Sequence, residues 1–352
     1  MASCSKVVGA TTALAVLYQN GDVDLDAPVY KYLPGFEANG KEGVTVRNLL
    51  LHNSGFSEGP STSYCSKAFD CPETRKAQPQ LSFDCRSKCY RALLADPLVR
   101  SPGTEYEYSD AGFMTIMYVV GRIARTRGYV TEADLLRGCP GDTDGWEQCY
   151  YEAFARKHVF QAAGMKTAGY LPERAAWGKC APTENQTAIY RHRQIQGEVH
   201  DENTYAMGGI SGHAGVFSDV EDMIEFTRGW LFPKEEGEGK NEGFLNRSTV
   251  KTFVTQYNHS QSSRALGWNT NTDDAPDMGW NHLCGTLSKT TFMHIGFTGT
   301  MVCADPERQM GLVLLTNRVY PDRSTSSQTS AYRRKFSQKA QEIFDSIYPS
   351  AH

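Results

Sequence analysis

The spacing of apolar residues predicts helices along most of the chain. Apolar residues recur at helical spacing from Val7 to Leu17, and Gly21 follows them, which predicts a helix over 3–19. The same periodicity predicts further helices at 44–51, 90–98, 113–127, 146–163, 220–231 and 246–256. We expect helix 3–19 to be central and to hold the residues at its tip rigidly.

Beyond Arg264 the pattern changes from helical to strand-like. Short apolar runs predict strands at 266–268, 291–294, 299–304 and 311–316, with a hairpin turn at 305–308 and a final helix at 326–347. Helices followed by a cluster of strands are typical of the α+β class. We expect one domain, 1–352, with a mostly helical lobe over about 20–262 and a sheet lobe over about 263–352 that includes helix 3–19.

Two polar segments, 57–92 and 131–149, interrupt this pattern and are interpreted as insertions. They hold several of the ten cysteines, which are Cys4, Cys65, Cys71, Cys85, Cys89, Cys139, Cys149, Cys180, Cys284 and Cys303. The sequence contains no Cys-x-x-Cys and no His-x-x-x-His, so neither a metal site nor a cofactor is expected. Clustered cysteines favour disulfides and an oxidising compartment.

Three glycosylation sequons begin at Asn185, Asn246 and Asn258. With the cysteines, they favour a secreted protein or one of the secretory-pathway lumen. No signal peptide precedes the first motif, and we expect a missing upstream segment to have carried it. The alternative is a cytoplasmic protein with reduced thiols and chance sequons.

Charge and hydropathy exclude some partner classes. The chain of 352 residues has 36 basic and 40 acidic residues, a net charge of −4, which suggests neither a nucleic acid nor an anionic membrane as partner. The longest mostly apolar run, 7–18, is too short to span a bilayer. Hydrophobic residues make up 40% of the chain, enough for a sizeable core. The sequence does not indicate an oligomeric state.

A Ser-x-x-Lys motif opens the chain. Ser3 and Lys6 are three residues apart, so a helix places both side chains on one face. A serine hydroxyl becomes a nucleophile when a base takes its proton, and a lysine of lowered pKa is such a base. A second copy, Ser248 to Lys251, is predicted to be an ordinary solvated helix turn.

Two further motifs follow in order. Tyr108-Ser109-Asp110 comes after a Pro-Gly turn, and His294-Ile295-Gly296-Phe297-Thr298-Gly299-Thr300 lies on a predicted late strand. Tyr108 is a candidate second base or proton shuttle, which requires a nearby cation to stabilise its phenolate. The alternative is a buried tyrosine between the lobes. A similar triplet, Tyr18-Gln19-Asn20, closes the first helix and is discounted.

The order of these motifs resembles that of the serine β-lactamase and penicillin-binding protein superfamily. A serine-lysine pair comes first, then a tyrosine, and then a strand with a cation-x-glycine motif. Nearly the whole chain shares the resemblance. Four phrases look like the class C-related branch of esterases, D-amino-acid-specific peptidases and β-lactamases. They are 50–55 (LLHNSG), 208–218 (GGISGHAGVFS), 305–308 (DPER) and 314–319 (LLTNRV). The fold implied is β-lactamase/transpeptidase-like, an antiparallel sheet flanked by helices plus a mostly helical lobe.

The resemblance implies a serine hydrolase that acts through an acyl-enzyme on an ester or amide, with a small or peptide-like acyl substrate. Ser3, Lys6 and Tyr108 would be catalytic. The N–H groups of Ser3 and Phe297 would form the oxyanion hole. Asp110, His294 and Gly296 would bind substrate.

Two positions depart from the common family pattern. His294 replaces a lysine, and because histidine is mostly neutral at pH 7, a weaker demand for a substrate carboxylate is expected, which favours esters or neutral amides. Asp110 stands where many relatives have asparagine, and its carboxylate would raise the pKa of Lys6. This argues against penicillin hydrolysis more than against catalysis.

The beginning of the chain is a third departure. Relatives carry a helix and two strands before the serine helix, so we expect an N-terminally shortened chain with an unpaired sheet edge. A catalytically impaired pseudoenzyme that serves as a binding module is therefore the alternative. A metallohydrolase or an α/β-hydrolase has no support, because the sequence contains no His-x-His-x-Asp-His, His-Glu-x-x-His or Gly-x-Ser-x-Gly.

Overall fold

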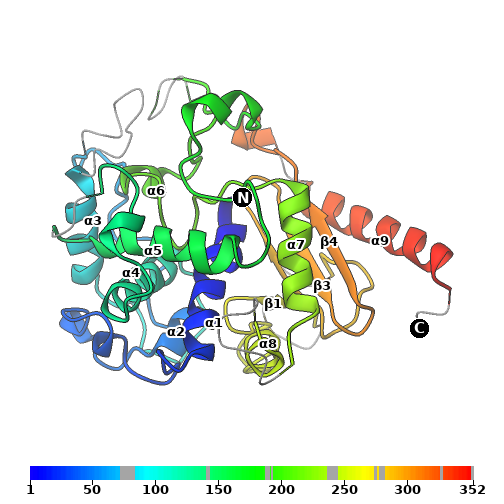
Figure 1. The fold of residues 1–352 in the computed structure, drawn as a ribbon, viewed down its shortest axis with the longest axis horizontal. Coiled ribbons are helices and arrows are strands. Elements are labelled where there is room, and N and C mark those ends of the chain that lie inside the picture. Colours follow the sequence, from blue (N-terminus) through cyan, green and yellow to red (C-terminus); the bar gives the residue numbers. More distant parts are fainter. Residues whose placement is uncertain are drawn as a thin grey trace.

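A computed structural model gives the fold (Figure 1). It describes residues 1–71, 84–139, 143–186, 191, 193–235, 245–272, 276, 282–325 and 328–349. Parts of both predicted insertions, Thr187 of the first sequon and the predicted start of the last helix lie outside the described residues. Most helices gather on one side of the molecule, and the sheet with its two covering helices lies on the other, with the first turn of the chain between them (Figure 1).

The sheet has four described strands in the order β1-β2-β3-β4, all antiparallel. They are β1 (Asn269–Thr270), β2 (Phe292–Ile295), β3 (Met301–Asp305) and β4 (Met310–Leu314). The last three strands confirm the sequence prediction to within a few residues. The prediction of a strand at 266–268 is wrong, because the pairing with β2 begins only at Asn269.

Two helices cover the two faces of the sheet (Figure 1). Alternate residues of a strand point to opposite faces. Val302 and Ala304 of β3 join the main core, which includes Trp230 of α7 (Val220–Leu231). Cys303 faces the other way, in a smaller core against which α9 (Thr329–Ile347) packs through Phe336, Ala340 and Phe344.

The predicted helix 3–19 is confirmed as one continuous helical run of changing pitch. It begins as a 3-10 turn, η1 (Ala2–Cys4), continues as a π-helical stretch, η2 (Lys6–Thr11), and ends as α1 (Thr12–Gln19). Every residue from Cys4 to Leu17 is buried. A fully buried helix has many packed neighbours, so the groups at its tip are held firmly.

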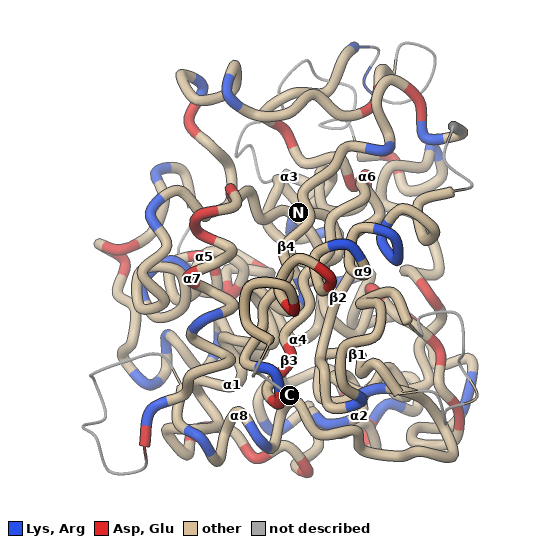
Figure 2. Tube along the Cα trace, turned by 90° about the vertical axis from the view of Figure 1, so that its right-hand side faces the viewer, with Lys and Arg blue, Asp and Glu red and all other residues tan. Residues whose placement is uncertain are grey.

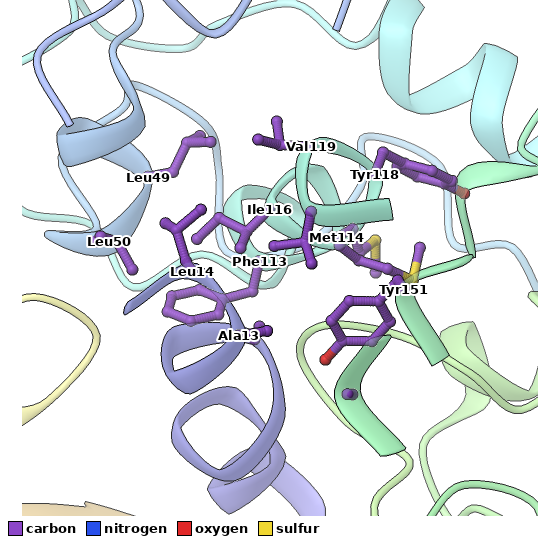
Figure 3. Close-up of a cluster of buried hydrophobic side chains, with 14 of the residues drawn as sticks. Ala13, Leu14, Leu49, Leu50, Phe113, Met114, Ile116, Tyr118, Val119 and Tyr151 are labelled. Atoms are coloured by element: carbon purple, nitrogen blue, oxygen red, sulfur yellow. The ribbon is translucent and has the colours of Figure 1, made fainter. Parts of the chain in front are cut away.

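Helices α4 and α5 pack closely beside this run. They are α4 (Asp110–Thr126) and α5 (Glu147–Ala155), which the π-helical η7 (Arg156–Phe160) extends. A Cβ on Gly121 would lie 1.8 Å from the carbonyl oxygen of Glu147, so only glycine permits this approach. Phe113 and Ile116 of α4 meet Leu14 of α1 and Leu49 of α2 (Val46–Leu50) in the core (Figure 3).

The remaining helices are shorter or lie nearer the surface. They are η3 (Val29–Lys31), η4 (Ala38–Gly40), α3 (Asp84–Ala95), η6 (Glu132–Asp134), η8 (Arg174–Lys179), α6 (Glu202–Ala206), α8 (Arg247–Val254) and η10 (Arg323–Thr325). Two of them, η8 and α6, fall where the sequence predicted only extended segments and loops. Each helix is only one or two turns long, which is too short to show the periodicity of apolar residues that predicts a helix.

Helix α4 begins at Asp110, three residues earlier than predicted, because the Ser109 side chain accepts a hydrogen bond from Gly112 N–H and caps it. The cap places Asp110 in the first turn of a buried helix.

Three disulfides join Cys71 to Cys85, Cys139 to Cys149 and Cys284 to Cys303. Cys4, Cys65, Cys89 and Cys180 take part in no disulfide among the described residues. Among the described helices, none combines the length and the apolar character needed to cross a membrane. Acidic and basic residues are interspersed along the trace (Figure 2).

Candidate active site

Ser3 and Lys6 meet at the tip of the buried helical run. Lys6 Nζ lies 3.2 Å from Ser3 Oγ, within hydrogen-bond distance, and the lysine side chain is fully buried. The spacing of the motif therefore brings the candidate nucleophile and the candidate base together as predicted. Burial excludes bulk water from the lysine, which strengthens each of its electrostatic contacts.

Lys6 has two further polar partners. Its Nζ lies 2.6 Å from an Asp110 carboxylate oxygen and 3.4 Å from the backbone carbonyl oxygen of His213. With Ser3, these account for the three protons of an ammonium group. Burial alone would lower the pKa of Lys6, but the charge of Asp110 and the Tyr108 phenol outweigh it, so the pKa is raised. The sequence prediction for Asp110 is thus supported, and Lys6 is a cation at rest.

Tyr108 lies against the same lysine, 4.7 Å from Nζ to the ring centroid. Its other neighbours are the His52 ring, stacked at 4.4 Å, and the Arg264 guanidinium, 5.3 Å from the ring centroid. Burial raises the pKa of Tyr108 although both cations oppose it. The nearby cation that a phenolate would require is therefore present in Lys6, but desolvation of the buried phenol outweighs its attraction and keeps Tyr108 protonated at rest.

His294 lies on β2 and is buried. Its Nδ1 is 2.8 Å from the Ile295 carbonyl oxygen, so this nitrogen carries the proton and Nε2 keeps its lone pair. Burial lowers the pKa of His294 well below its usual value, and nearby Arg264 and Lys6 add to this. The ring is neutral, in agreement with the sequence prediction. Within the described part of the chain, Nε2 has no hydrogen-bond partner.

Gly296 allows the first turn of the chain to lie on the sheet. A Cβ there would lie 2.1 Å from Thr300 Oγ1 and 2.5 Å from the Met1 carbonyl oxygen. Thr300 Oγ1 donates a hydrogen bond to that carbonyl at 2.8 Å, and Cys4 Sγ donates to the His294 carbonyl at 3.6 Å. The segment that carries Ser3 is therefore fixed directly beside the turn that carries Phe297.

Phe297 projects from this turn and is 47% exposed. In the part of the chain that the structure describes, its N–H donates to no protein acceptor. A backbone N–H without a protein acceptor beside the nucleophile is what an oxyanion-hole donor requires. Its ring stacks on His200 at 5.9 Å, and the Arg318 guanidinium lies 4.2 Å from its centroid.

A second polar layer lies behind Lys6, and its contact with the lysine was not predicted from the sequence. The His213 ring nitrogens lie 2.8 Å from Ser211 Oγ and 2.9 Å from an Asp201 oxygen. These contacts fix the peptide whose carbonyl accepts from Lys6. The glycine-rich phrase 208–218, which contains His213, was the signal in the sequence that could have indicated this layer.

Ligand atoms of Asp110, Asp201 and His213 lie within 4.8 Å of one another, close enough to bind a metal ion together. Lys6 already contacts Asp110, and His213 already contacts Asp201. The three groups are thus satisfied without a metal, and we derive no chemistry through one. Burial alone would raise the pKa of Asp201, but His213 and Thr204 outweigh it, so the pKa is lowered.

The motif copies discounted above lie elsewhere. Ser248 and Lys251 are exposed on α8, where Ser248 Oγ bonds the Asn246 side chain at 3.1 Å, as predicted for a solvated turn. Tyr18 packs edge-on against Phe253 at 5.7 Å.

Comparison with known proteins places this arrangement in a family. Residues 1–334 match the family model described as Beta-lactamase. The N-acetylmuramyl-L-alanine amidase of Bacillus subtilis is 32% identical over 330 residues, which cover 90% of this chain and 67% of that protein. A putative D-alanyl-D-alanine carboxypeptidase of Salmonella enteritidis is 29% identical over 331 residues, 90% of this chain and 68% of that protein.

Solved structures agree on the fold. A family VIII carboxylesterase superposes with a TM-score of 0.64 at 17% identity, covering 96% of this chain and 82% of that chain. Likeness at this identity shows the β-lactamase/transpeptidase-like fold alone. The match over most of the chain goes further than the fold: this protein belongs to the Beta-lactamase family.

Proposed function

We propose that this protein is a serine acyl-hydrolase that acts through an acyl-enzyme on an ester or amide. The observation that carries the proposal is the 3.2 Å contact between Ser3 Oγ and the buried Lys6 Nζ. Relatives in the family are named as an amidase and a carboxypeptidase, and a protein of the same fold as a carboxylesterase. All three names describe transfer of an acyl group to water.

The first step would be attack of Ser3 Oγ on the substrate carbonyl, with transfer of the hydroxyl proton to Lys6. Because Lys6 is a cation at rest, it must first release a proton to water, and the Asp110 carboxylate at 2.6 Å opposes this loss by raising the pKa of Lys6. The N–H groups of Ser3 and Phe297 would stabilise the negative charge that develops on the carbonyl oxygen. Activity should therefore rise with pH toward the alkaline side.

Acylation ends when the proton held by Lys6 passes by way of Tyr108 to the leaving alcohol or amine, and in the second half of the reaction water attacks the acyl-enzyme and releases the acid. Tyr108 is protonated at rest, so it acts first as a proton donor to the leaving group rather than as a base. The Tyr108 ring centroid lies 4.7 Å from Lys6 Nζ, so Tyr108 would regain its proton from Lys6. Asp201 and His213 would act as positioning residues for Lys6.

The proposed substrate is a small or peptide-like acyl compound. His294 is neutral and buried, so it would not attract a substrate carboxylate by charge. Gly296 would keep the segment that carries Ser3 close to β2, because a side chain there would meet the Met1 carbonyl. We propose that the helical and sheet parts act as one domain, with the site between them.

The three disulfides are compatible with an extracellular protein. We propose a secreted or secretory-pathway protein that carries a glycan at Asn258, which is exposed. Mass analysis of protein from a secreting eukaryotic host, with and without glycosidase treatment, tests this site; an unchanged mass contradicts it.

A fluorophosphonate probe tests the catalytic proposal, with intact mass as the readout. One adduct on the parent and on Ser248→Ala, with none on Ser3→Ala, is the expected result. The Ser248→Ala variant is the matched control because it removes the other Ser-x-x-Lys serine. No adduct on a folded parent protein overturns the hydrolase and leaves the binding-module alternative.

A further inference from the structure

A buried arginine of the last helix contacts the turn that joins β2 to β3. Arg333 lies in the second turn of α9, and only 4% of the residue is exposed. Its Nη2 donates to the Gly296 carbonyl at 2.7 Å and to the Thr300 carbonyl at 3.0 Å. One nitrogen of a side chain from a distant part of the sequence therefore holds both ends of this turn.

The turn also closes on itself through backbone hydrogen bonds. Gly296 N–H donates to the Thr300 carbonyl at 2.8 Å, and Gly299 N–H donates to the Gly296 carbonyl at 2.9 Å. With Arg333, each of these two carbonyl oxygens accepts two hydrogen bonds, and a carbonyl oxygen has two lone pairs. The direction of the Gly296 carbonyl is therefore fixed by two donors.

The Gly296 carbonyl and the Phe297 N–H belong to the same peptide group. This peptide is trans, because the one cis peptide among the described residues joins Tyr320 to Pro321. In a planar trans peptide the C=O and the N–H point in opposite directions. By holding the carbonyl from the side of α9, Arg333 directs the Phe297 N–H away from α9. This is the N–H that the proposed function assigns to the oxyanion hole.

Arg333 also brings a positive charge to this peptide. Burial lowers the pKa of Arg333, and the other titratable groups of the described chain that act on it are Cys4 and Arg318, neither of which is a carboxylate. Its Nε has no hydrogen-bond partner within the same residues. A buried cation without a carboxylate partner is costly, so stability alone gives no reason for its position.

We infer that Arg333 is a positioning residue for the oxyanion hole, which orients the peptide between Gly296 and Phe297 and strengthens its N–H as a donor. A cation bound to a peptide carbonyl polarises the whole peptide group, because hydrogen bonds in a chain polarise one another. The N–H on the other side then stabilises the charge that develops on the substrate oxygen more strongly. The inference rests on the proposed function, because it takes Phe297 N–H as an oxyanion donor.

The test compares an oxoester with the thionoester of the same acid and alcohol. Sulfur is a weak hydrogen-bond acceptor, so the thionoester gains little from the donors of an oxyanion hole. Loss of a direct donor lowers kcat about 100-fold to 1000-fold. Arg333 acts through that donor, so Arg333→Gln should lower kcat/KM for the oxoester about tenfold to thirtyfold and for the thionoester about threefold or less.

Ser337→Ala is the matched control on the same helix. Ser337 lies one turn further along α9 and is buried, and its hydroxyl donates to the Leu283 carbonyl at 3.0 Å, away from the turn. This variant should keep the parent's ratio of oxoester to thionoester activity. A folded Arg333→Gln protein that also keeps this ratio overturns the positioning role, whether both activities fall equally or neither falls.

Arg333→Lys keeps a cation on α9 but changes the geometry of its donors. It should restore part of the ratio that Arg333→Gln loses, and it should still fall below the parent by about threefold for the oxoester alone. If Arg333→Gln does not fold, Arg333→Lys decides the question in its place, and an unchanged ratio in this variant overturns the inference.

Fluorophosphonate labelling of Ser3 in the parent separates the two proposals. Labelling of the parent together with equal losses for both esters in Arg333→Gln overturns the positioning role and leaves the hydrolase. No labelling of a folded parent overturns the hydrolase and this inference with it.

Discussion

Asp110→Asn is the change that most directly tests the role of Lys6. Asparagine keeps the size of the side chain and an acceptor oxygen, but it removes the charge 2.6 Å from Lys6 Nζ. Opposite unit charges 4 Å apart attract by about 4 kcal/mol at an effective dielectric constant of about 20. The Asp110 side chain is 25% exposed, so solvent screens part of this attraction.

A neighbouring opposite charge changes the pKa of a titratable group by about 1 to 3. We therefore expect the pKa of Lys6 to fall by about 2 in Asp110→Asn. A neutral lysine would then be available at lower pH, and the rising limb of the activity profile should move about 2 pH units toward acid. The assay is kcat/KM for an activated ester between about pH 5 and about pH 10.

The same change has a cost in stability. The raised pKa of Lys6 means that its ion pair stabilises the fold below the lysine's unfolded pKa, and this contribution is lost as pH rises through the folded value. Asp110→Asn should therefore be less stable than the parent at neutral pH, by about 3 kcal/mol for a buried lysine left without its carboxylate. Urea unfolding checks this.

A folded Asp110→Asn protein whose activity profile keeps the parent's rising limb would refute the assignment of Lys6 as the base. Glu152→Gln is the control, because it removes a buried carboxylate that pairs with Arg156, outside the site.

Three further predictions concern other parts of the molecule. Burial alone would raise the pKa of Glu184, but Arg323 and its other partners lower it to about 2, so about 3 kcal/mol of stability should disappear as pH falls from about 5 to about 2. Urea unfolding across this range should show a smaller loss in Glu184→Gln; parallel curves would contradict it. Asp201→Asn should lower kcat about tenfold with KM unchanged and move the rising limb toward acid, because it frees the His213 peptide and removes a nearby charge. An unmoved pH profile would reduce Asp201 to a structural role. Gly121→Ala should lower the free energy of unfolding in urea by about 3 kcal/mol, because its Cβ would overlap the Glu147 carbonyl. Gly43→Ala should change it very little, because its Cβ meets open space. Equal stability of the two variants would contradict the packing of α4 on α5.

Motif order and local periodicity were enough to predict the Ser3–Lys6 contact, the central helix and three of the four strands. Ser3 and Lys6 are close in sequence, so helix geometry alone joins them. The Lys6 contact with the His213 carbonyl spans 207 residues and follows from no local pattern. The protonation state of Tyr108 also depends on burial, which a list of neighbouring charges does not reveal.

The strand predicted at 266–268 shows a different limit. Trp268 reads as a strand residue because it is large and apolar, but its ring packs in the core beside Trp230 and Phe292. A short run of apolar residues indicates that the segment is buried, but it does not distinguish a strand from a packed loop.

The first turn of the chain has a consequence for cooperativity. Met1 and Cys4 are held by Thr300 and the His294 peptide of the sheet part, whereas Lys6 is held by Asp110 at the start of α4. No state in which the two parts separate can retain the Ser3–Lys6 geometry. Thermal inactivation should therefore coincide with the exchange of the slowest amide protons and with the calorimetric transition, so that enzymatic activity itself reports global unfolding.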